Sequence, residues 1–351
     1  MLASAARQSG LMPLVIDHYA DQDTCMLAEA VFKVDQLNQY NLETGLEYFI
    51  SRYPVPRAIY GSGLEQAPEC IDILARRFEL LGNDYTTFRR VQNKRHFFAL
   101  LAELKIPYPE VVFDRPPTCE GWLIKPQQGG GGAGIRRFTG QSDIEAAVYW
   151  QKMIPGVSGS ALFLANRKRA RIIGYNTQWN VCSGPDSEFV FAGIINKSPL
   201  SPSEELYVFE WIQALVRVYA LIGLNTLDFI VQDGQVFALE LNPRPSASMQ
   251  LYSDGILSQH IETCRGQLDM PSDCVTGCCG YQLVFADKTL QIPENIEWPK
   301  QCMDLPATGV IIRKGQPICS MMAREKRPEQ VFKKLKATQQ ILVNQLKIGH
   351  G

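Results

Sequence analysis

The sequence lacks long apolar runs and carries almost no net charge. Its 351 residues have a formal net charge of −1, and no apolar stretch approaches the ~20 residues of a membrane span. A chain without a basic excess gives no sign of a nucleic-acid or anionic-membrane partner. The small, apolar N-terminus also lacks the basic segment that opens a signal peptide. We therefore expect a cytoplasmic protein that begins with a helix running into a strand.

Histidine is scarce, and the ten cysteines show no standard metal-binding spacing. The four histidines form no ligand-like pair, and no Ser/His/Asp arrangement stands out. Cys274, Cys278 and Cys279 lie close together, with Cys264 and His260 nearby, but a zinc site needs a second ligand pair at a recognisable distance. We expect reduced thiols that are buried or lie in loops, and a structural role for His260.

Strand and helix patterns alternate along the chain and predict a mixed α/β fold. The hydrophobic content of 46% and the charged content of 20% are ordinary for a globular protein, and the length favours two or three subdomains. We expect one domain over residues 1–84 with the βαβ pattern of an open, mostly parallel sheet. A second domain over residues 85–351 would contain a small subdomain at about 108–155.

The periodicities predict individual elements. We expect helices over Leu2–Gly10, Thr24–Lys33, Pro68–Leu81, Tyr85–Leu104, Ile144–Trp150, Glu204–Ile222 and Pro328–Lys347, and one helix that ends near Ile50. We expect strands over Met12–Ile16, Arg57–Tyr60, Trp122–Ile124, Ile135–Phe138, Gly159–Ala165, Arg171–Thr177 and Tyr281–Phe285, and short strands within Gly309–Met322. An open sheet normally starts with a strand, but Met1 stands at the start of a helix. Either the sheet lacks its first strand or the true start lies upstream.

The segment Leu227–Ser246 is the most informative stretch. It reads as a β-hairpin on which Asp228, Glu240, Asn242 and Arg244 place two carboxylates, an amide and a guanidinium on an otherwise apolar ribbon. Hard cations take oxygen ligands, and Mg²⁺ typically uses one or two carboxylates together with substrate phosphates. The segment therefore predicts a site for Mg²⁺ and a polyphosphate.

The face on which Asp228 lies depends on the turn of this hairpin, because side chains alternate between the faces of a strand. A two-residue turn ending at Gly234 would pair Asp228 with Leu239, on the face opposite to Glu240. A three-residue loop over Gln232, Asp233 and Gly234, with Gly234 as a G1 bulge, would pair Asp228 with Ala238 and place it diagonally beside Glu240. We predict the second register, with both carboxylates on one face.

A glycine-rich loop over Gln127–Gly134 is the second strong signal. Five of its eight residues are glycine, which allows consecutive backbone N–H groups to approach a phosphate closely. It lacks the Lys-Ser/Thr ending of a Walker loop and the regular spacing of a dinucleotide fingerprint. Lys125 precedes the loop and Lys94 lies in an earlier helical region, so each is a candidate for neutralising phosphate oxygens. We expect a phosphate-binding lid.

These features resemble the ATP-grasp superfamily of carboxylate–amine and carboxylate–thiol ligases over nearly the whole chain. The motifs that carry the resemblance are NK at 93–94, IKP at 124–126, GGGGAG at 129–134 and LDF…ELNPR ending at Arg244. GSGLE at 61–65 and LLGN at 80–83 are similar to the subgroup of carbamoyl-phosphate synthase and biotin carboxylase. The resemblance implies an α/β ATP-grasp fold, with residues 1–84 as the pre-ATP-grasp domain and residues 85–351 as the ATP-grasp domain.

The resemblance also implies the cofactors ATP and Mg²⁺, with Mn²⁺ as an alternative, and it assigns residues to them. Lys94 and Lys125 would contact the phosphates. The mobile lid over the phosphates would contain Gly129, Gly130, Gly131, Gly132 and Gly134. The linker that meets adenine, mostly through its backbone, would be Gln151, Lys152, Met153 and Ile154. Many relatives have an acidic residue at the position of Gln151. One or two Mg²⁺ ions would be held by Asp228, Glu240 and Asn242.

The reaction implied by this resemblance activates a carboxylate as an acyl phosphate, which an amine, or less often a thiol, then attacks. Lys125 and Arg244 would be catalytic, and Arg244 would orient the carboxylate or the transferring phosphoryl group. We expect small-molecule carboxylate and amine substrates, with glutamate or a precursor of a one-carbon cofactor as the first choice, and a homodimer as one assembly. Side chains that would line the acceptor side are Ser246, Ser248, Gln250, Tyr175, Asn176 and Trp179.

Two other functions remain open at this point. One is an ATP-binding regulatory protein that kept the fold without turnover, although the full set of hairpin and lysine residues argues against it. The other is a dinucleotide-dependent oxidoreductase, which only the GSGLE segment and the βαβ start suggest. The oxidoreductase would not explain the polar residues of the hairpin.

Overall fold

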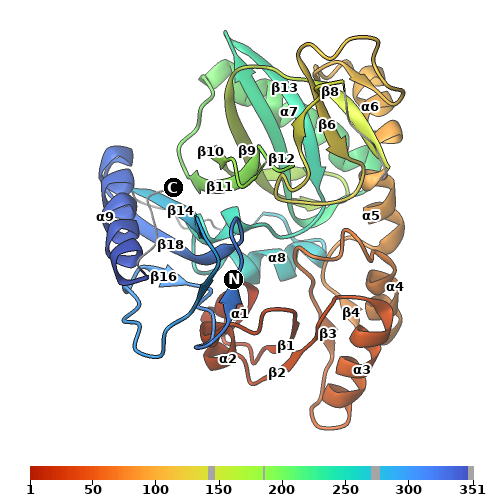
Figure 1. Cartoon of the computed structure of the whole chain (residues 1–351). Coiled ribbons are helices and arrows are strands. Elements are labelled where there is room, and N and C mark those ends of the chain that lie inside the picture. The colour runs from red at the N-terminus through yellow and green to blue at the C-terminus, as the bar shows by residue number, and fades with distance from the viewer. Residues whose placement is uncertain (141–146, 185, 270–276, 347–351) are drawn as a thin grey trace.

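The computed structural model describes residues 1–140, 147–184, 186–269 and 277–346. Figure 1 shows the N-terminal part at the bottom, a small sheet at the upper right, and a large sheet that runs beside it from the top to the left. The large sheet has eight strands in the order β13-β12-β9-β10-β11-β14-β18-β16, and every pairing in it is antiparallel. The predicted mixed α/β fold is therefore confirmed.

The N-terminal part pairs its strands in parallel, as the βαβ pattern predicts. Its elements are α1 (Leu2–Gln8), β1 (Leu14–Asp17), α2 (Gln22–Leu27), β2 (Ala30–Lys33), α3 (Gln39–Ile50), β3 (Arg57–Ala58), α4 (Glu69–Arg77) and β4 (Glu79–Leu80). Strand β1 pairs with β2, and β3 pairs with β4. The helix expected over Thr24–Lys33 is wrong in its second half, because the apolar segment of β2 is held by pairing with β1. The helix expected over Pro68–Leu81 likewise ends early, and β4 follows it.

The helical region predicted over Tyr85–Leu104 is two helices, α5 (Tyr85–Gln92) and α6 (Lys94–Glu103). Asn93 ends α5, and its side chain accepts a hydrogen bond from the His96 amide at 3.1 Å, which caps the N-terminus of α6. The cap makes Lys94 the first residue of α6. The break thus places the Lys94 side chain where it can pair with Glu240, whereas Asn93 itself stays exposed.

A four-stranded sheet forms the small upper part, in the order β5-β8-β6-β7. Its strands are β5 (Val111–Val112), β6 (Trp122–Pro126), β7 (Arg136–Arg137) and β8 (Val148–Lys152). The helix expected over Ile144–Trp150 is wrong where the structure describes it, because residues 148–150 belong to β8; residues 141–146 lie outside the described residues. The β-branched and aromatic side chains of VYW favour a strand between two partners.

The large sheet buries both faces at its centre. Its first strands are β9 (Val157–Asn166), β10 (Ala170–Val181) and β11 (Val190–Ile195), and the last of these was not predicted. Along β9, Phe163 packs toward α7 (Pro202–Tyr219), whereas Leu162 and Leu164 pack toward η1 (Ala247–Leu251) and α8 (Ile256–Cys264). Since both faces are covered, β9 is a continuous apolar run and not an alternating one.

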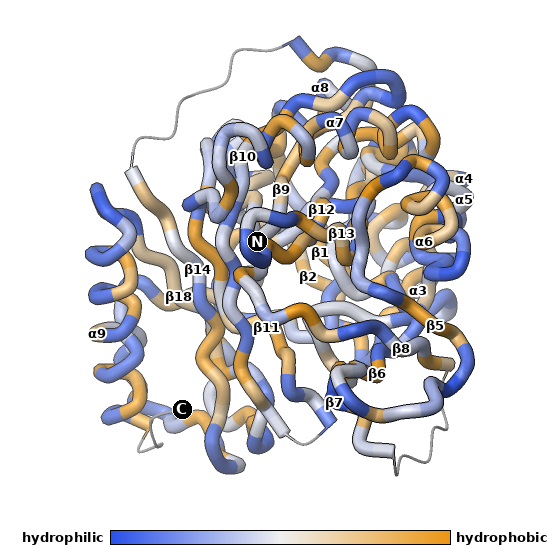
Figure 2. Tube along the Cα trace, turned by 90° about the horizontal axis from the view of Figure 1, so that it is seen from above, coloured by the Kyte–Doolittle hydropathy of each residue, from blue (hydrophilic) through white to orange (hydrophobic). Residues whose placement is uncertain are grey.

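The C-terminal part extends the large sheet and covers one of its faces. It contains β14 (Cys278–Phe285), β15 (Leu290–Gln291), β16 (Cys302–Met303), β17 (Ile311–Ile312), β18 (Pro317–Glu325) and α9 (Pro328–Leu346). Figure 2 shows the apolar side of α9 turned toward β14 and β18, with its polar side outward. Among the described residues, no helix has both the length and the apolar character needed to cross a bilayer.

The hairpin of β12 (Ile222–Gln232) and β13 (Gln235–Asn242) has a different register from the one predicted. The turn consists of Asp233 and Gly234, both with positive φ. It is therefore the two-residue turn and not the predicted three-residue loop. A β-bulge then inserts Leu239 as an extra residue, so that Asp228 pairs directly with Glu240. The predicted register is wrong, but the predicted placement of both carboxylates on one face is confirmed.

His260 joins three parts of the fold. It is fully buried on α8, where its Nδ1 accepts the Leu224 amide at 2.8 Å and its Nε2 lies 3.2 Å from the Leu81 carbonyl. The ring is therefore neutral, with its proton on Nε2. Burial lowers the pKa of His260 from 6.5 to about 4, although the hydrogen bond to Leu81 acts in the opposite direction.

This burial makes stability depend on pH. In the unfolded chain His260 becomes protonated below about pH 6.5. In the folded chain it stays neutral until the pH approaches 4. Stability is therefore complete above pH 6.5 and falls as the pH drops through this window, by roughly 2 kcal/mol at pH 5. Urea unfolding at pH 7 and pH 5 measures the loss. We expect His260→Gln to be less stable at pH 7 but to lose less on acidification, and the exposed His18→Gln to behave as wild type. Equal losses in all three proteins would contradict this explanation.

Candidate active site

Two carboxylates lie opposite each other at the centre of the site. Both oxygens of Asp228 accept hydrogen bonds from neutral amides, at 3.2 Å from Gln178 Nε2 and 3.0 Å from Asn242 Nδ2. Burial, followed by repulsion from Glu240, raises the pKa of Asp228 to about 7. Within the described residues, the hydrogen-bond partners of Asp228 are therefore neutral, and no cation is paired with it.

Lys94 supplies positive charge to the other carboxylate. Its ammonium group, placed by the first turn of α6, forms an ion pair with Glu240 Oε1, and only 9% of the Lys94 side chain is exposed. Burial alone would raise the pKa of Glu240, but Lys94, helped by Lys125 and Arg244, lowers it below the usual value. The structure therefore pairs the residue predicted to bind phosphate with a residue predicted to bind metal.

Lys125 lies on β6 of the small sheet, near enough for the charges of Glu240 and Asp228 to act on its pKa. Its Nζ donates to Gln151 Oε1 at 3.0 Å and lies 5.9 Å from the centre of the Tyr149 ring. Burial lowers the pKa of Lys125 to about 8, against the attraction of Glu240. The acceptor is a neutral amide, so Lys125 keeps its positive charge available to an anion in the cleft.

The glycine loop is held against the large sheet. The Phe191 amide donates to the Gly131 carbonyl at 2.9 Å, and the Gly134 amide donates to Ser187 Oγ at 3.2 Å. A Cβ on Gly132 would lie 2.0 Å from the Phe189 carbonyl oxygen, and the φ of Gly132 is +78°. Glycine at this position permits the close approach, which argues against a simple flexible linker.

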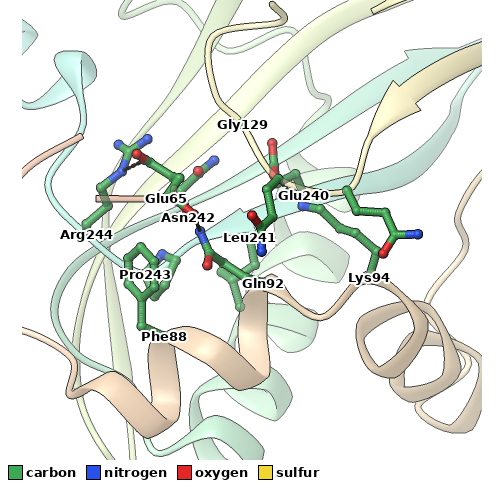
Figure 3. Close-up of a pocket in the computed structure, with 12 residues that line it drawn as sticks. Glu65, Phe88, Gln92, Lys94, Gly129, Glu240, Leu241, Asn242, Pro243 and Arg244 are labelled. Carbon is green, nitrogen blue, oxygen red and sulfur yellow. Dashed lines mark hydrogen bonds and ion pairs between the residues drawn. The ribbon is translucent and has the colours of Figure 1, made fainter. Parts of the chain in front are cut away.

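Arg244 lies beyond the hairpin and is held by the N-terminal part. Its Nε donates to Glu65 Oε1 at 2.6 Å, and its Nη1 donates to the Pro245 carbonyl at 3.2 Å. Figure 3 shows Glu65 and Arg244 at one end of a pocket and Lys94 and Glu240 at the other. The two ion pairs thus mark opposite ends of one cleft, with amides and the edge of the glycine loop also lining it.

The backbone before Arg244 is anchored by Asn83, which is 2% exposed. Its Nδ2 donates to the Pro243 carbonyl at 3.0 Å and to Asn225 Oδ1 at 2.9 Å, while its Oδ1 accepts the Ile222 amide. The LLGN segment therefore fixes both ends of the hairpin to the N-terminal part.

Some of the predicted nucleotide residues lie elsewhere or contribute little through their side chains. The Lys152 ammonium donates to the Glu120 carbonyl at 2.9 Å and lies 4.6 Å from the centre of the Trp122 ring, on the face of the small sheet opposite to Lys125. Its main-chain N–H is taken by the Glu110 carbonyl. Ile154 is half-buried in the segment between β8 and β9. The main-chain N–H of Met153 is likewise taken, by the Gly121 carbonyl at 2.8 Å.

The acceptor-side candidates divide in the same way. Ser246 Oγ lies 2.8 Å from both Thr226 Oγ1 and Ser248 Oγ, close to the hairpin. In contrast, Tyr175 donates to the Glu205 carbonyl, and Trp179 packs against Phe332. Asn176 is buried and accepts a hydrogen bond from Tyr252. Gln250 is half-buried in η1.

Sequence reasoning missed Gln178 and Glu65 as site residues. Gln178 contacts Asp228 across the sheet, a pairing that depends on the order of strands and leaves no local signal. Glu65 did carry a signal in the sequence, because it directly follows an apolar residue in the GSGLE segment. The structure shows that it is only 8% exposed. Such an acid needs a partner.

The donor set fits a hard cation. Two carboxylates face each other, and Asn242, whose Nδ2 donates to Asp228, has no hydrogen bond to its Oδ1 within the described residues. Burial, and next to it the negative charge of Glu240, raises the pKa of Asp228, and a bound cation would act against both effects. Oxygen donors of this kind suit Mg²⁺ or Mn²⁺. Elsewhere in the described residues, Cys264, Cys278 and Cys279 join no metal-binding cluster, and Cys274 lies outside them.

Comparison with known proteins finds a family match for the part of the chain that contains these residues. A family model described as an ATP-grasp domain matches residues 91–248, which run from the end of α5 to η1. The chain carries an ATP-grasp domain. The predicted superfamily is thereby confirmed. An uncharacterized protein of Methanocaldococcus jannaschii is 22% identical over 265 residues, which are 71% of this chain and 59% of the relative. The chain thus spans 59% of the length of the curated relative that it matches.

Solved structures share the fold over almost the whole chain. The biotin carboxylase of Campylobacter jejuni with β-γ-ATP has a TM-score of 0.73 at 14% identity, covering 99% of this chain and 89% of that one. The biotin carboxylase domain of Hydrogenobacter thermophilus 2-oxoglutarate carboxylase, a dimer with MgADP and bicarbonate, scores 0.71 at 12%, covering 96% and 86%. The N5-carboxyaminoimidazole ribonucleotide synthetase of Thermotoga maritima scores 0.68 at 13%, covering 97% and 96%. At these identities the likeness establishes the ATP-grasp fold alone.

The docked glycine loop gives a test with a built-in control. Gly132→Ala places a Cβ against the Phe189 carbonyl at positive φ, whereas Gly130→Ala meets only ordinary contacts near 4 Å and has no positive φ. We expect Gly132→Ala to weaken docking by roughly 1–3 kcal/mol. Hydrogen exchange at the Phe191 amide, which donates to the Gly131 carbonyl, would then be about tenfold faster or more, and unchanged in Gly130→Ala. Equal protection in both variants would rule out the docking interpretation.

Proposed function

We propose that the protein is an ATP- and Mg²⁺-dependent ligase that activates a carboxylate as an acyl phosphate and joins it to an amine. The observation that carries the proposal is the direct pairing of Asp228 with Glu240, with Lys94 and Arg244 lining the adjoining cleft and the charge of Lys125 acting on Glu240. The ATP-grasp domain supports the nucleotide part of this proposal, because solved structures of the same fold contain ADP, MgADP or β-γ-ATP.

The ion pairs suggest how the site would accept a nucleotide. Lys94 is engaged with Glu240, so it would be available to phosphate only when Glu240 takes another cation. A metal between Asp228 and Glu240 would serve as that cation and would also neutralise the charge on Asp228. We infer that metal and nucleotide bind cooperatively, each making the site ready for the other.

The residues would then act by position and charge. The substrate carboxylate would attack the γ-phosphorus of ATP, ADP would leave, and an amine would displace phosphate from the acyl phosphate with loss of a proton. Lys94 and Lys125 would hold phosphate oxygens, and Arg244 would hold the reacting carboxylate. Bound Mg²⁺ would neutralise charge that develops on the phosphates. The docked glycine loop would exclude water from this chemistry.

The finer assignments are proposals of the same kind. We propose a small amino-acid substrate such as glutamate, or a cofactor precursor, a cytoplasmic location, and a homodimer as one assembly. The GSGLE turn does not favour an oxidoreductase, because the Gly63 amide donates to Glu65 Oε2 at 2.6 Å and is not free for a dinucleotide. A regulatory protein without turnover is the alternative that an activity assay would separate.

The first test is ADP formation with a panel of amino acids and amines. Glu240→Gln removes one charge of the carboxylate pair and should lower kcat by at least roughly 100-fold. Asp233→Asn is the matched control, since it removes a carboxylate from the turn of the same hairpin and retains a residue suited to positive φ. We expect it to keep wild-type activity. Full activity in Glu240→Gln would refute the site. MgATP binding without ADP formation on any panel would favour the regulatory protein.

The second test concerns binding in the absence of turnover. Isothermal titration with a non-hydrolysable ATP analogue should show affinity at least about tenfold higher with Mg²⁺ than without it in the wild type. In Glu240→Gln, Lys94 is released from its partner, so metal-free binding should be tighter than in the wild type and Mg²⁺ should add less than about threefold. Weaker metal-free binding in this variant would contradict the exchange of partners at Lys94.

A further inference from the structure

The Glu65–Arg244 ion pair joins two segments that are 179 residues apart. Both side chains are nearly buried, with 11% of the Glu65 side chain and 10% of the Arg244 side chain exposed. A buried pair is costly to desolvate and is a weak source of stability, so its presence at a cleft needs another explanation. Its geometry supplies one.

Glu65 is itself held rigidly by its own loop. Its Oε2 accepts the Gly63 amide at 2.6 Å, and its main-chain carbonyl accepts Gln92 Nε2 from α5 at 3.4 Å. Leu64 and Ala67, on either side, are buried in the core of the N-terminal part. The carboxylate is therefore a fixed point against which another group would be oriented.

The contacts of Arg244 leave one edge of its guanidinium open. Nε is bound to Glu65 and Nη1 to the Pro245 carbonyl, whereas Nη2 has no hydrogen bond within the described residues. The glycine loop lies next to Nη2, since a Cβ on Gly130 would be 4.0 Å from it and 3.9 Å from Glu65 Oε1. The open amino group thus lies next to the glycine loop, and Arg244 is one of the residues that line the cleft.

We propose that Glu65 is a positioning residue, which holds Arg244 by its Nε edge so that Nη2 is presented to the reacting carboxylate. This inference rests on the proposed ligase function. It assigns the N-terminal part a direct share in the reaction, because its loop determines the direction of a guanidinium carried by the ATP-grasp domain. The carboxylate of Glu65 itself need not touch the substrate.

A double-mutant cycle separates positioning from a direct role. Glu65→Gln is nearly isosteric and removes the charge. We expect kcat for ADP formation to fall about 10- to 100-fold while the KM for ATP stays within about twofold, because the nucleotide residues are untouched. In an Arg244→Lys background, which lacks the Nε edge, adding Glu65→Gln should cost less than about threefold. Equal losses in both backgrounds would overturn the proposal. Glu43→Gln, an exposed acid on α3, is the control and should behave as wild type.

A chemical probe tests the positioning even if the ligase assay fails. Phenylglyoxal modification of Arg244, followed by peptide mass spectrometry, should be at least about fivefold faster in Glu65→Gln than in the wild type and in Glu43→Gln, since an ion-paired guanidinium is restrained. An unchanged rate would overturn the proposal. A wild type that forms no ADP on any panel, together with a faster rate in Glu65→Gln, would contradict the ligase function but not the restraint on Arg244. If Glu65→Gln does not fold, Glu65→Asp replaces it, and wild-type kinetics and reactivity there would overturn the proposal.

Discussion

Two carboxylates of like charge, Asp228 and Glu240, lie directly opposite each other on one hairpin, and the rest of the site is arranged around the repulsion between them. The repulsion adds to burial in raising the pKa of Asp228 to about 7. On the other side, Glu240 is kept ionised by Lys94 at the capped start of α6. The charge of Lys125 acts on the pair from the small sheet, and Gln178 and Asn242 donate to Asp228. A cation bound at this site, as proposed, would offset the like charges of the two carboxylates.

The N-terminal part contributes to the site by contacts rather than by covering it. Asn83 ties the Pro243 carbonyl and the Ile222 amide to one side chain, which holds the two ends of the hairpin. Tyr60 donates to the Asn83 carbonyl at 2.6 Å, and Glu65 binds the guanidinium of Arg244. The N-terminal part therefore holds both the backbone and the Arg244 side chain at the end of β13. The segments GSGLE and LLGN, which the sequence alone singles out, thus hold the end of the hairpin in place.

Much of the site followed from the sequence, because its groups are local. Glu240 and Asn242 lie on one face because side chains two residues apart in a strand point the same way. The run of glycines indicates that the backbone approaches another group closely. The register of the hairpin did not follow, since the bulge at Leu239 arises when a preferred two-residue turn must be reconciled with the pairing of Asp228 and Glu240. The predicted three-residue loop placed a bulge at Gly234, whereas the structure has a two-residue turn and its bulge at Leu239.

Other failures have a common cause in tertiary pairing. The segments of β2 and β8 resemble helices in isolation, and partner strands override this tendency. Lys152 shows that the face of a strand matters as well. It follows Gln151 directly in β8, so its side chain lies on the face opposite to Gln151 and Lys125. Contacts between distant segments, such as Gln178 with Asp228, had no local pattern from which to be predicted.

The central claim is that Glu240 exchanges Lys94 for a metal ion when nucleotide binds. A crystal structure with Mn²⁺ and a non-hydrolysable ATP analogue would test it most directly, because anomalous scattering locates Mn²⁺ without ambiguity. The account predicts a Mn²⁺ peak between the carboxylates of Asp228 and Glu240, with the Lys94 ammonium moved from Glu240 to a phosphate oxygen. A structure with nucleotide bound, Lys94 still paired with Glu240 and no metal at these carboxylates would contradict it.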